Sequence, residues 1–126
     1  MKKTIYLFGN QDLEMDSLPI RLIPELQKEF PETDFVVLDP NEEWNVPEEM
    51  IIIDTVVGIK EITVFEDLEH FDAAPKLTCH DFDAFFNLRI LKKLGKLRKI
   101  KIIGVPPHAV LETTTKSVTE KLRCNI

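Results

Sequence analysis

The sequence predicts an α/β protein, a three-layer α/β/α sandwich built on a mostly parallel, twisted sheet of about five strands. Short apolar runs alternate along the chain with amphipathic segments, which is typical of repeated strand–helix units. Most of these runs are apolar on both sides and rich in β-branched residues, as strands are when helices cover both faces of a sheet. The 126 residues, 44% of them apolar, suit one core, so we expect a single domain over residues 1–126.

Four apolar runs are expected to form buried strands, and a fifth run an edge strand. The four buried runs are Ile5–Phe8, Phe35–Leu38, Met50–Ile53 and Ile100–Ile103. The fifth run, Glu61–Glu66, alternates in character instead, with Ile62 and Val64 on one side and Thr63 and Phe65 on the other. Such alternation favours a strand at the margin of the sheet.

The first predicted helix begins near Ser17, a candidate N-cap, and carries Pro19 in its first turn. Its apolar residues recur at near-helical spacing, at Leu18, Leu22, Leu26 and Phe30. We expect Pro24 to kink this helix, because proline removes a backbone hydrogen bond.

Two more helices are predicted in the second half of the chain. One begins at Asp81, presents a phenylalanine- and leucine-rich face, and stops at Gly95, a typical residue after a helix C-terminus. A short last helix is expected from about Thr115 to Arg123, with Val118 and Leu122 as its one spaced apolar pair.

Charge and hydropathy exclude several classes of function. The net charge of −6 gives no general attraction for nucleic acid or an anionic membrane. No apolar run approaches the roughly 18 residues of a membrane-spanning helix, and the N-terminal run is too short for a signal peptide. The chain has two cysteines, Cys79 and Cys124. We therefore expect a cytoplasmic monomer with reduced thiols.

One basic stretch stands out in this acidic chain. It consists of Arg89, Lys92, Lys93, Lys96, Arg98, Lys99 and Lys101. No aromatic residues interleave with the lysines to stack bases, which argues against nucleic acid. Such charges usually form a solvated face, and a docking patch for an acidic protein surface is the alternative.

The candidate site is formed by polar residues at the carboxyl ends of the predicted strands, where ligands bind in open α/β sheets. Asp16 belongs to the loop after the first strand, Asp54 follows the third, and His80 precedes the second long helix. Two carboxylates and one imidazole suit a borderline divalent ion such as nickel or zinc. We therefore interpret these three residues as a metal-recognition site.

Each of the three residues also has a structural interpretation. Asp54 could form a turn, Asp16 could cap the helix at Ser17, and His80 could be an ordinary residue at a helix start. A thiol nucleophile at Cys79 with His80 as its base is disfavoured, because adjacent residues of an extended segment point to opposite sides.

Two other ligand classes are poorly supported. The segment Phe8–Gln11 holds one glycine, whereas a dinucleotide fingerprint needs three and a P-loop needs Gly-Lys-Ser/Thr. A signalling receiver domain would need an acidic pair directly after the first strand and a lysine after the last, and Phe8–Asn10 and Gly104–Pro106 provide neither.

Four short motifs occur together in one order. Gly9-Asn10 is followed by Asp16 and Arg21, an apolar strand ends in Asp54, His80 opens a helix, and the last strand ends in Gly104-Val105-Pro106-Pro107. This pattern resembles the nickel-iron hydrogenase maturation endopeptidases in the spacing and order of its motifs over roughly residues 4 to 107.

The resemblance implies an α/β/α fold and a cytoplasmic hydrolase, a protease of hydrogenase maturation. Its substrate would be the precursor of the hydrogenase large subunit, from which it would remove a C-terminal extension after nickel insertion. Asp16, Asp54 and His80 would be the catalytic, metal-binding trio, and the nickel would arrive with the substrate. No serine or cysteine stands in a convincing nucleophile arrangement, so a metal-bound water is one option for the attack. The rival hypothesis is a non-catalytic metal- or protein-binding module on the same fold.

Overall fold

The structure is a computed structural model that describes residues 3–8, 17–38, 47–56, 59–66, 88–107 and 109–125. Its labelled elements are β1 (Lys3–Leu7), α1 (Leu18–Glu29), β2 (Thr33–Val37), β3 (Glu49–Thr55), β4 (Thr63–Phe65), β5 (Lys99–Val105) and α4 (Leu111–Asn125). Residues 88–93 are also helical.

The five strands form one sheet in the order β2-β1-β3-β5-β4. Strands β2, β1, β3 and β5 are parallel, and β4 pairs antiparallel with β5 at one margin. The longest pairing joins β3 to β5, from Glu49 opposite Lys99 to Thr55 opposite Val105. The predicted mostly parallel sheet is therefore confirmed, as is an edge strand within residues 61–66. The expectation that residues 35–38 form a buried strand is wrong, because β2 is the other edge of the sheet and Val36 and Val37 are exposed.

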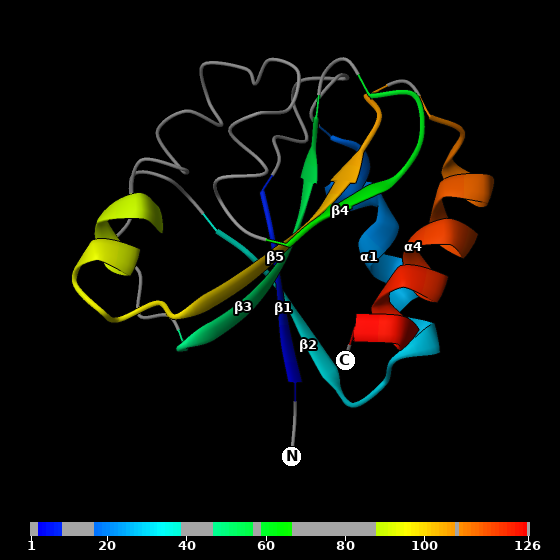
Figure 1. Cartoon of the computed structure of the whole chain (residues 1–126). Coiled ribbons are helices and arrows are strands. Elements are labelled where there is room, and N and C mark those ends of the chain that lie inside the picture. Colours follow the sequence, from blue (N-terminus) through cyan, green and yellow to red (C-terminus); the bar gives the residue numbers. More distant parts are fainter. Residues whose placement is uncertain are drawn as a thin grey trace.

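Helices cover both faces of the sheet. Successive side chains of each strand point to opposite faces, so each face has its own apolar cluster. Ile5 and Leu7 of β1 join the apolar cluster with α1 and α4, whereas Tyr6 and Phe8 join the cluster that includes Leu88. Figure 1 shows α1 and α4 together on one side of the sheet and the helical residues 88–93 on the other. This is the predicted three-layer α/β/α arrangement.

Helix α1 follows the predicted apolar spacing. Leu18, Leu22 and Leu26 are fully buried against the sheet. Ser17 occupies the N-cap position, although its side chain makes no capping hydrogen bond. The helix continues through Pro24 and reaches its C-cap at Phe30.

Helix α4 is longer than predicted, at 15 residues. Its buried stripe contains Val118 and Leu122, as expected, and also Thr114 and Thr119. Threonine has a low intrinsic helix propensity, so the sequence pattern missed the first turn. Burial of Thr114 in this first turn offsets that preference. The expected range of residues 115–123 was therefore too short.

The end of the middle helix lies where it was predicted. Residues 88–93 are helical, Leu88 is fully buried, and Gly95 has the positive φ of 77° that favours glycine after a helix. The expected start at Asp81 lies outside the described residues.

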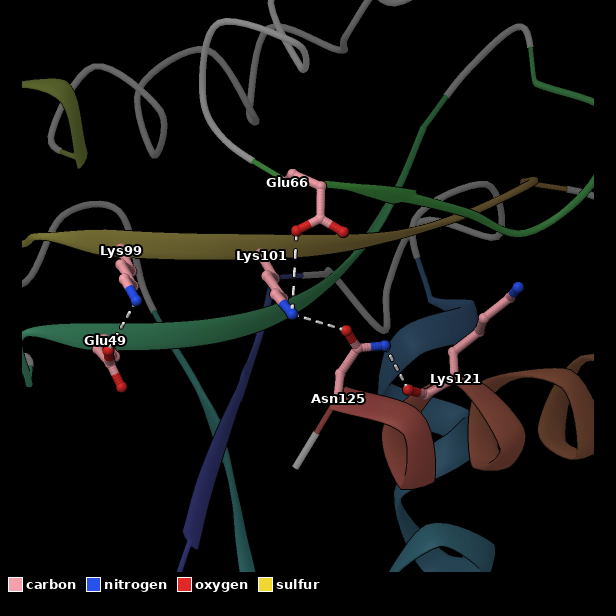
Figure 2. Close-up of polar contacts among 6 residues, drawn as sticks. All are labelled: Glu49, Glu66, Lys99, Lys101, Lys121 and Asn125. Atoms are coloured by element: carbon pink, nitrogen blue, oxygen red, sulfur yellow. Dashed lines mark hydrogen bonds and ion pairs between the residues drawn. The ribbon is translucent and has the colours of Figure 1, made fainter.

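The C-terminus of α4 is attached to the sheet by polar contacts, which Figure 2 shows. Lys101 Nζ on β5 donates a hydrogen bond to Asn125 Oδ1 at 2.9 Å, and Asn125 Nδ2 donates to the Lys121 carbonyl at 2.6 Å. On its other side α4 contacts α1, where the Arg123 guanidinium lies 2.8 Å from a Glu29 carboxylate oxygen. No helix in the described ranges is long and apolar enough to cross a membrane.

Candidate functional site

Asp54 lies near the carboxyl end of β3, at the centre of the sheet, and its exposed fraction is 0%. The backbone N–H of Thr55 donates to its Oδ1 at 2.8 Å, which fixes one carboxylate oxygen. By strand alternation its side chain shares a face with Ile52, the face that the helical residues 88–93 cover. Asp54 thus lies at the carboxyl end of the third strand as predicted, although inside β3 and not after it.

The backbone around Asp54 is held on both sides beyond the regular strand. Phe8 N–H donates to the Ile53 carbonyl at 3.1 Å, and Val56 N–H donates to the Val105 carbonyl at 2.9 Å. Both Phe8 and Val56 are buried. These bonds hold the backbone on both sides of Asp54 in place.

Gly104 faces Asp54 across the β3–β5 ladder. A Cβ at this position would lie 2.9 Å from Val56 Cγ2, 3.0 Å from Phe65 Cε2 and 3.3 Å from Ile59 Cδ1. These side chains therefore occupy the space that any other residue would need. Sequence reasoning marked Gly104 as part of a motif but missed its role beside Asp54, which only the strand register reveals.

Tyr6 lies on the same face of the sheet, on the neighbouring strand. It pairs with Ile52 and is 9% exposed. Burial raises the pKa of the Tyr6 phenol above its usual value of 10.0. The phenol is therefore neutral at physiological pH and adds no charge to the surroundings of Asp54.

The other predicted site residues, Asp16 and His80, lie outside the described residues, as do Gly9, Asn10 and Cys79. Among the residues that are described, no group of three His, Cys, Asp or Glu side chains could hold a metal ion. The meeting of Asp16, Asp54 and His80 thus stays a prediction.

Helix α1, which follows Asp16, and the helical residues 88–93, which follow His80, nevertheless run alongside the strands in the direction that leads back to the end of the sheet where Asp54 lies. Thr33 N–H donates to the Phe30 carbonyl at 3.0 Å, so a tight turn joins the end of α1 to the start of β2. At about 1.5 Å per residue, α1 then carries Ser17 back to the carboxyl ends of the strands. The helical residues 88–93 likewise end beside the start of β5.

Two hollows in the described part of the molecule lie away from Asp54. The larger, of about 760 Å³, is lined by α1 and α4 and includes Glu25, Glu29 and Glu120. The smaller, of about 220 Å³, lies at the amino ends of the strands and includes Lys3, Lys99 and Asn125. Neither contains a predicted site residue.

Most of the basic stretch is exposed, which both of its interpretations, a solvated face and a docking patch, require. Lys92, Lys93 and Lys96 are exposed on and after the helical residues 88–93. Farther along, three cations pair loosely with glutamates at 3.8 to 3.9 Å: the exposed Arg98 with Glu48, the exposed Lys99 with Glu49 and the half-buried Lys101 with Glu66.

Comparison with solved structures identifies proteins of similar fold. The nickel-iron hydrogenase maturation protease HybD from Thermococcus kodakarensis is similar with a TM-score of 0.66 and 19% identity, covering 97% of each chain. The hydrogenase maturating endopeptidase HybD from E. coli gives the same score and identity, covering 95% of this chain and 89% of that one. An Escherichia coli endopeptidase reaches a TM-score of 0.70 at 18% identity, covering 97% of this chain and 90% of that one.

No protein-family model and no curated protein matches the chain. The similarity is therefore one of structure, at identities below 20%, and it spans nearly the whole of the chains compared. This chain has the α/β fold of the hydrogenase maturation proteases, the fold that its sequence resemblance implied.

Proposed function

We propose that this protein is an endopeptidase that removes the C-terminal extension of a nickel-iron hydrogenase large-subunit precursor after nickel insertion. Asp16, Asp54 and His80 together recognise the nickel that the precursor carries. The observation that carries the proposal is the position of Asp54, a fully buried carboxylate at the carboxyl end of the central strand. It occupies this position in a fold whose solved examples include maturation proteases.

The chemistry of Asp54 suits a divalent ion. Burying a carboxylate is costly unless hydrogen bonds or a cation offset its charge. The Thr55 N–H supplies one hydrogen bond to Oδ1, and a nickel ion would add a much stronger interaction with the same carboxylate. Nickel accepts carboxylate oxygen and imidazole nitrogen together, which is the donor set that Asp16, Asp54 and His80 would provide.

Complete burial of Asp54 has a consequence for how substrate would bind. An ion held by another protein can reach a carboxylate with 0% exposure only after neighbouring groups move apart. We therefore expect docking of the precursor to open the carboxyl end of the sheet. Recognition of the metal would then be coupled to recognition of the protein around it.

Processing of the precursor tests the proposal directly. The protein is incubated with nickel-loaded and nickel-free large-subunit precursor from the source organism, and the products are separated by electrophoresis and mass spectrometry. We expect a shortened large subunit only from the nickel-loaded precursor. An unprocessed precursor in both samples would contradict the proposed activity.

The rival function, a non-catalytic binding module on the same fold, predicts a different outcome in the same samples. Binding of the precursor without any cleavage, measured by calorimetry and mass spectrometry, would favour that module. Cleavage of the nickel-free precursor at the same rate would retain a peptidase but remove nickel recognition from its mechanism.

A further inference from the structure

The free edge of β2 has backbone groups in position to pair with another strand. Strand β2 is the outermost strand of the sheet on the side away from β4. Leu38 N–H donates to the Leu7 carbonyl at 2.9 Å. Because backbone groups alternate in direction along a strand, the groups of Val36 also point to β1. Those of Thr33, Phe35 and Val37 point away from the sheet.

The first of these outward positions is already occupied by the chain itself. Thr33 N–H donates to the Phe30 carbonyl at 3.0 Å, and Gln27 Nε2 donates to the Thr33 carbonyl at 2.9 Å. The described residues provide no hydrogen bond to the outward N–H and C=O groups of Phe35 and Val37. Within the described part of the chain, one half of the edge is thus closed and the other half is open.

The open half is also apolar and accessible. Val36 and Val37 are 39% and 44% exposed. Val36 pairs with Tyr6 and Val37 with Leu7, so the two valines lie on opposite faces of the sheet. An incoming strand would therefore find apolar side chains to contact above and below its hydrogen bonds. Natural edge strands usually block such a surface with charge or proline.

We propose that residues 35–37 of β2 bind an extended segment of the precursor as a sixth strand, an inference that rests on the proposed function. Outward N–H and C=O groups at alternate residues match an extended polypeptide, the ligand that adds to a sheet edge. A second copy of this chain is disfavoured. Each copy carries a net charge of −6, and Glu32 and Asp34 are exposed beside the open groups.

The distance to Asp54 fixes where the docked segment would lie in the substrate. Neighbouring strands are about 4.8 Å apart, so a strand added to β2 would lie about 14 Å from β3. An extended chain covers about 3.3 Å per residue. At least about four residues of extended chain therefore separate the docked strand from a bond cleaved beside Asp54.

Amide hydrogen exchange at single-residue resolution tests this inference on the wild-type protein with nickel-loaded precursor. The Phe35 and Val37 amides should exchange rapidly in the free protein and at least about tenfold more slowly in the complex, because pairing protects them. The Val36 amide, which faces β1, should be protected in both states. Cleavage of the precursor without protection at Phe35 and Val37 would overturn the docking site but retain the peptidase. Protection without cleavage would support the docking site and contradict the peptidase.

A matched pair of variants separates backbone pairing from side-chain contact. Val37→Pro removes the outward donor and is compatible with an edge strand, whereas Val37→Thr retains the donor and the β-branched shape. We expect the proline variant to raise the Kd for the precursor about tenfold, and the threonine variant to change it less than about twofold. Equal effects of the two variants would contradict strand addition. Protection of the Val37 amide that grows with protein concentration in the absence of precursor would identify a second copy as the occupant and overturn the proposal.

Discussion

At the scale of single residues, the feature that shapes the surroundings of Asp54 is the missing side chain of Gly104. Asp54 and Gly104 face each other on β3 and β5. The volume above Gly104 is filled by Val56 and Phe65, two side chains of restricted flexibility. This packing belongs to the candidate site and to the core at once, so a change at Gly104 should affect both.

Gly104→Ala is expected to lower the free energy of unfolding by about 0.5–2 kcal/mol. Overpacking of this kind destabilises the folded state by about 1–3 kcal/mol. Alanine also restricts the unfolded chain more than glycine does, which favours the folded state by about 0.4–1 kcal/mol. Urea denaturation of the variant and the wild type measures the difference.

The double variant Gly104→Ala with Val56→Ala provides the control, because it removes the atom closest to the new Cβ. The two changes should cost less together than the sum of their separate effects, as expected for residues in contact. Strict additivity, or a neutral Gly104→Ala, would show that β5 shifts to make room.

At the scale of elements, the polar groups at the edge of a strand and at the end of a helix find their hydrogen-bond partners in different ways. Gln27 closes the first outward position of β2, and Asn125 connects the end of α4 to β5. Residues at such ends make few local contacts, so single polar side chains have a large influence there. The outward groups of Phe35 and Val37 on β2 receive no hydrogen bond from the described residues, which is why we assign them a partner.

Asn125→Ala should weaken the attachment of α4 to the sheet and lower the free energy of unfolding by about 1 kcal/mol. The variant loses a partly buried hydrogen bond from Lys101 and a bond to the Lys121 carbonyl (Figure 2). Urea denaturation gives the global effect, and amide exchange in the last turn of α4 gives the local one.

Glu66→Ala is the matched control, because it removes the other partner of Lys101. That ion pair spans 3.9 Å and involves an exposed glutamate, so its loss should cost less than about 0.5 kcal/mol. If Glu66→Ala proved more damaging than Asn125→Ala, the assigned importance of the Lys101–Asn125 contact would be wrong.

At the scale of the whole molecule, the proposed site combines three segments that are far apart in the sequence. Asp54 belongs to the central strand, Asp16 precedes α1, and His80 precedes the helical residues 88–93. These helices lie on opposite faces of the sheet (Figure 1). A site that draws on both would lie across the carboxyl end of the sheet, where parallel α/β proteins bind ligands.

Asp16→Asn, Asp54→Asn and His80→Ala should each reduce nickel-dependent processing of the precursor by about 100-fold or more while leaving the fold intact. Each change removes one donor or charge from a site that is expected to act as a unit. The rate of appearance of the shortened subunit measures activity, and circular dichroism reports the fold.

Glu120→Gln is the control for these variants, since it neutralises an exposed carboxylate on α4 and should leave processing unchanged. Wild-type activity in any one of the three site variants would remove that residue from the proposed trio. A loss of activity in Glu120→Gln of similar size would indicate a general effect of charge.

The sequence by itself determined the order and type of the main elements, because hydrophobic periodicity reports directly which faces of a strand or helix are buried. The apolar spacing of α1, the mostly parallel strands, the edge position of β4 and the placement of Asp54 were all predictable on this basis. Tertiary structure decided what depends on contacts between distant segments. Thr114 in the first turn of α4 is buried against the rest of the fold, and Gly104 is required because Val56 and Phe65 fill its space. On the outer side of β2, the side chain of Gln27 donates to the Thr33 carbonyl, whereas the described residues provide no such bond to Phe35 or Val37. Such features follow from side-chain packing and strand register, which depend on residues far apart in the sequence and cannot be read from a local pattern.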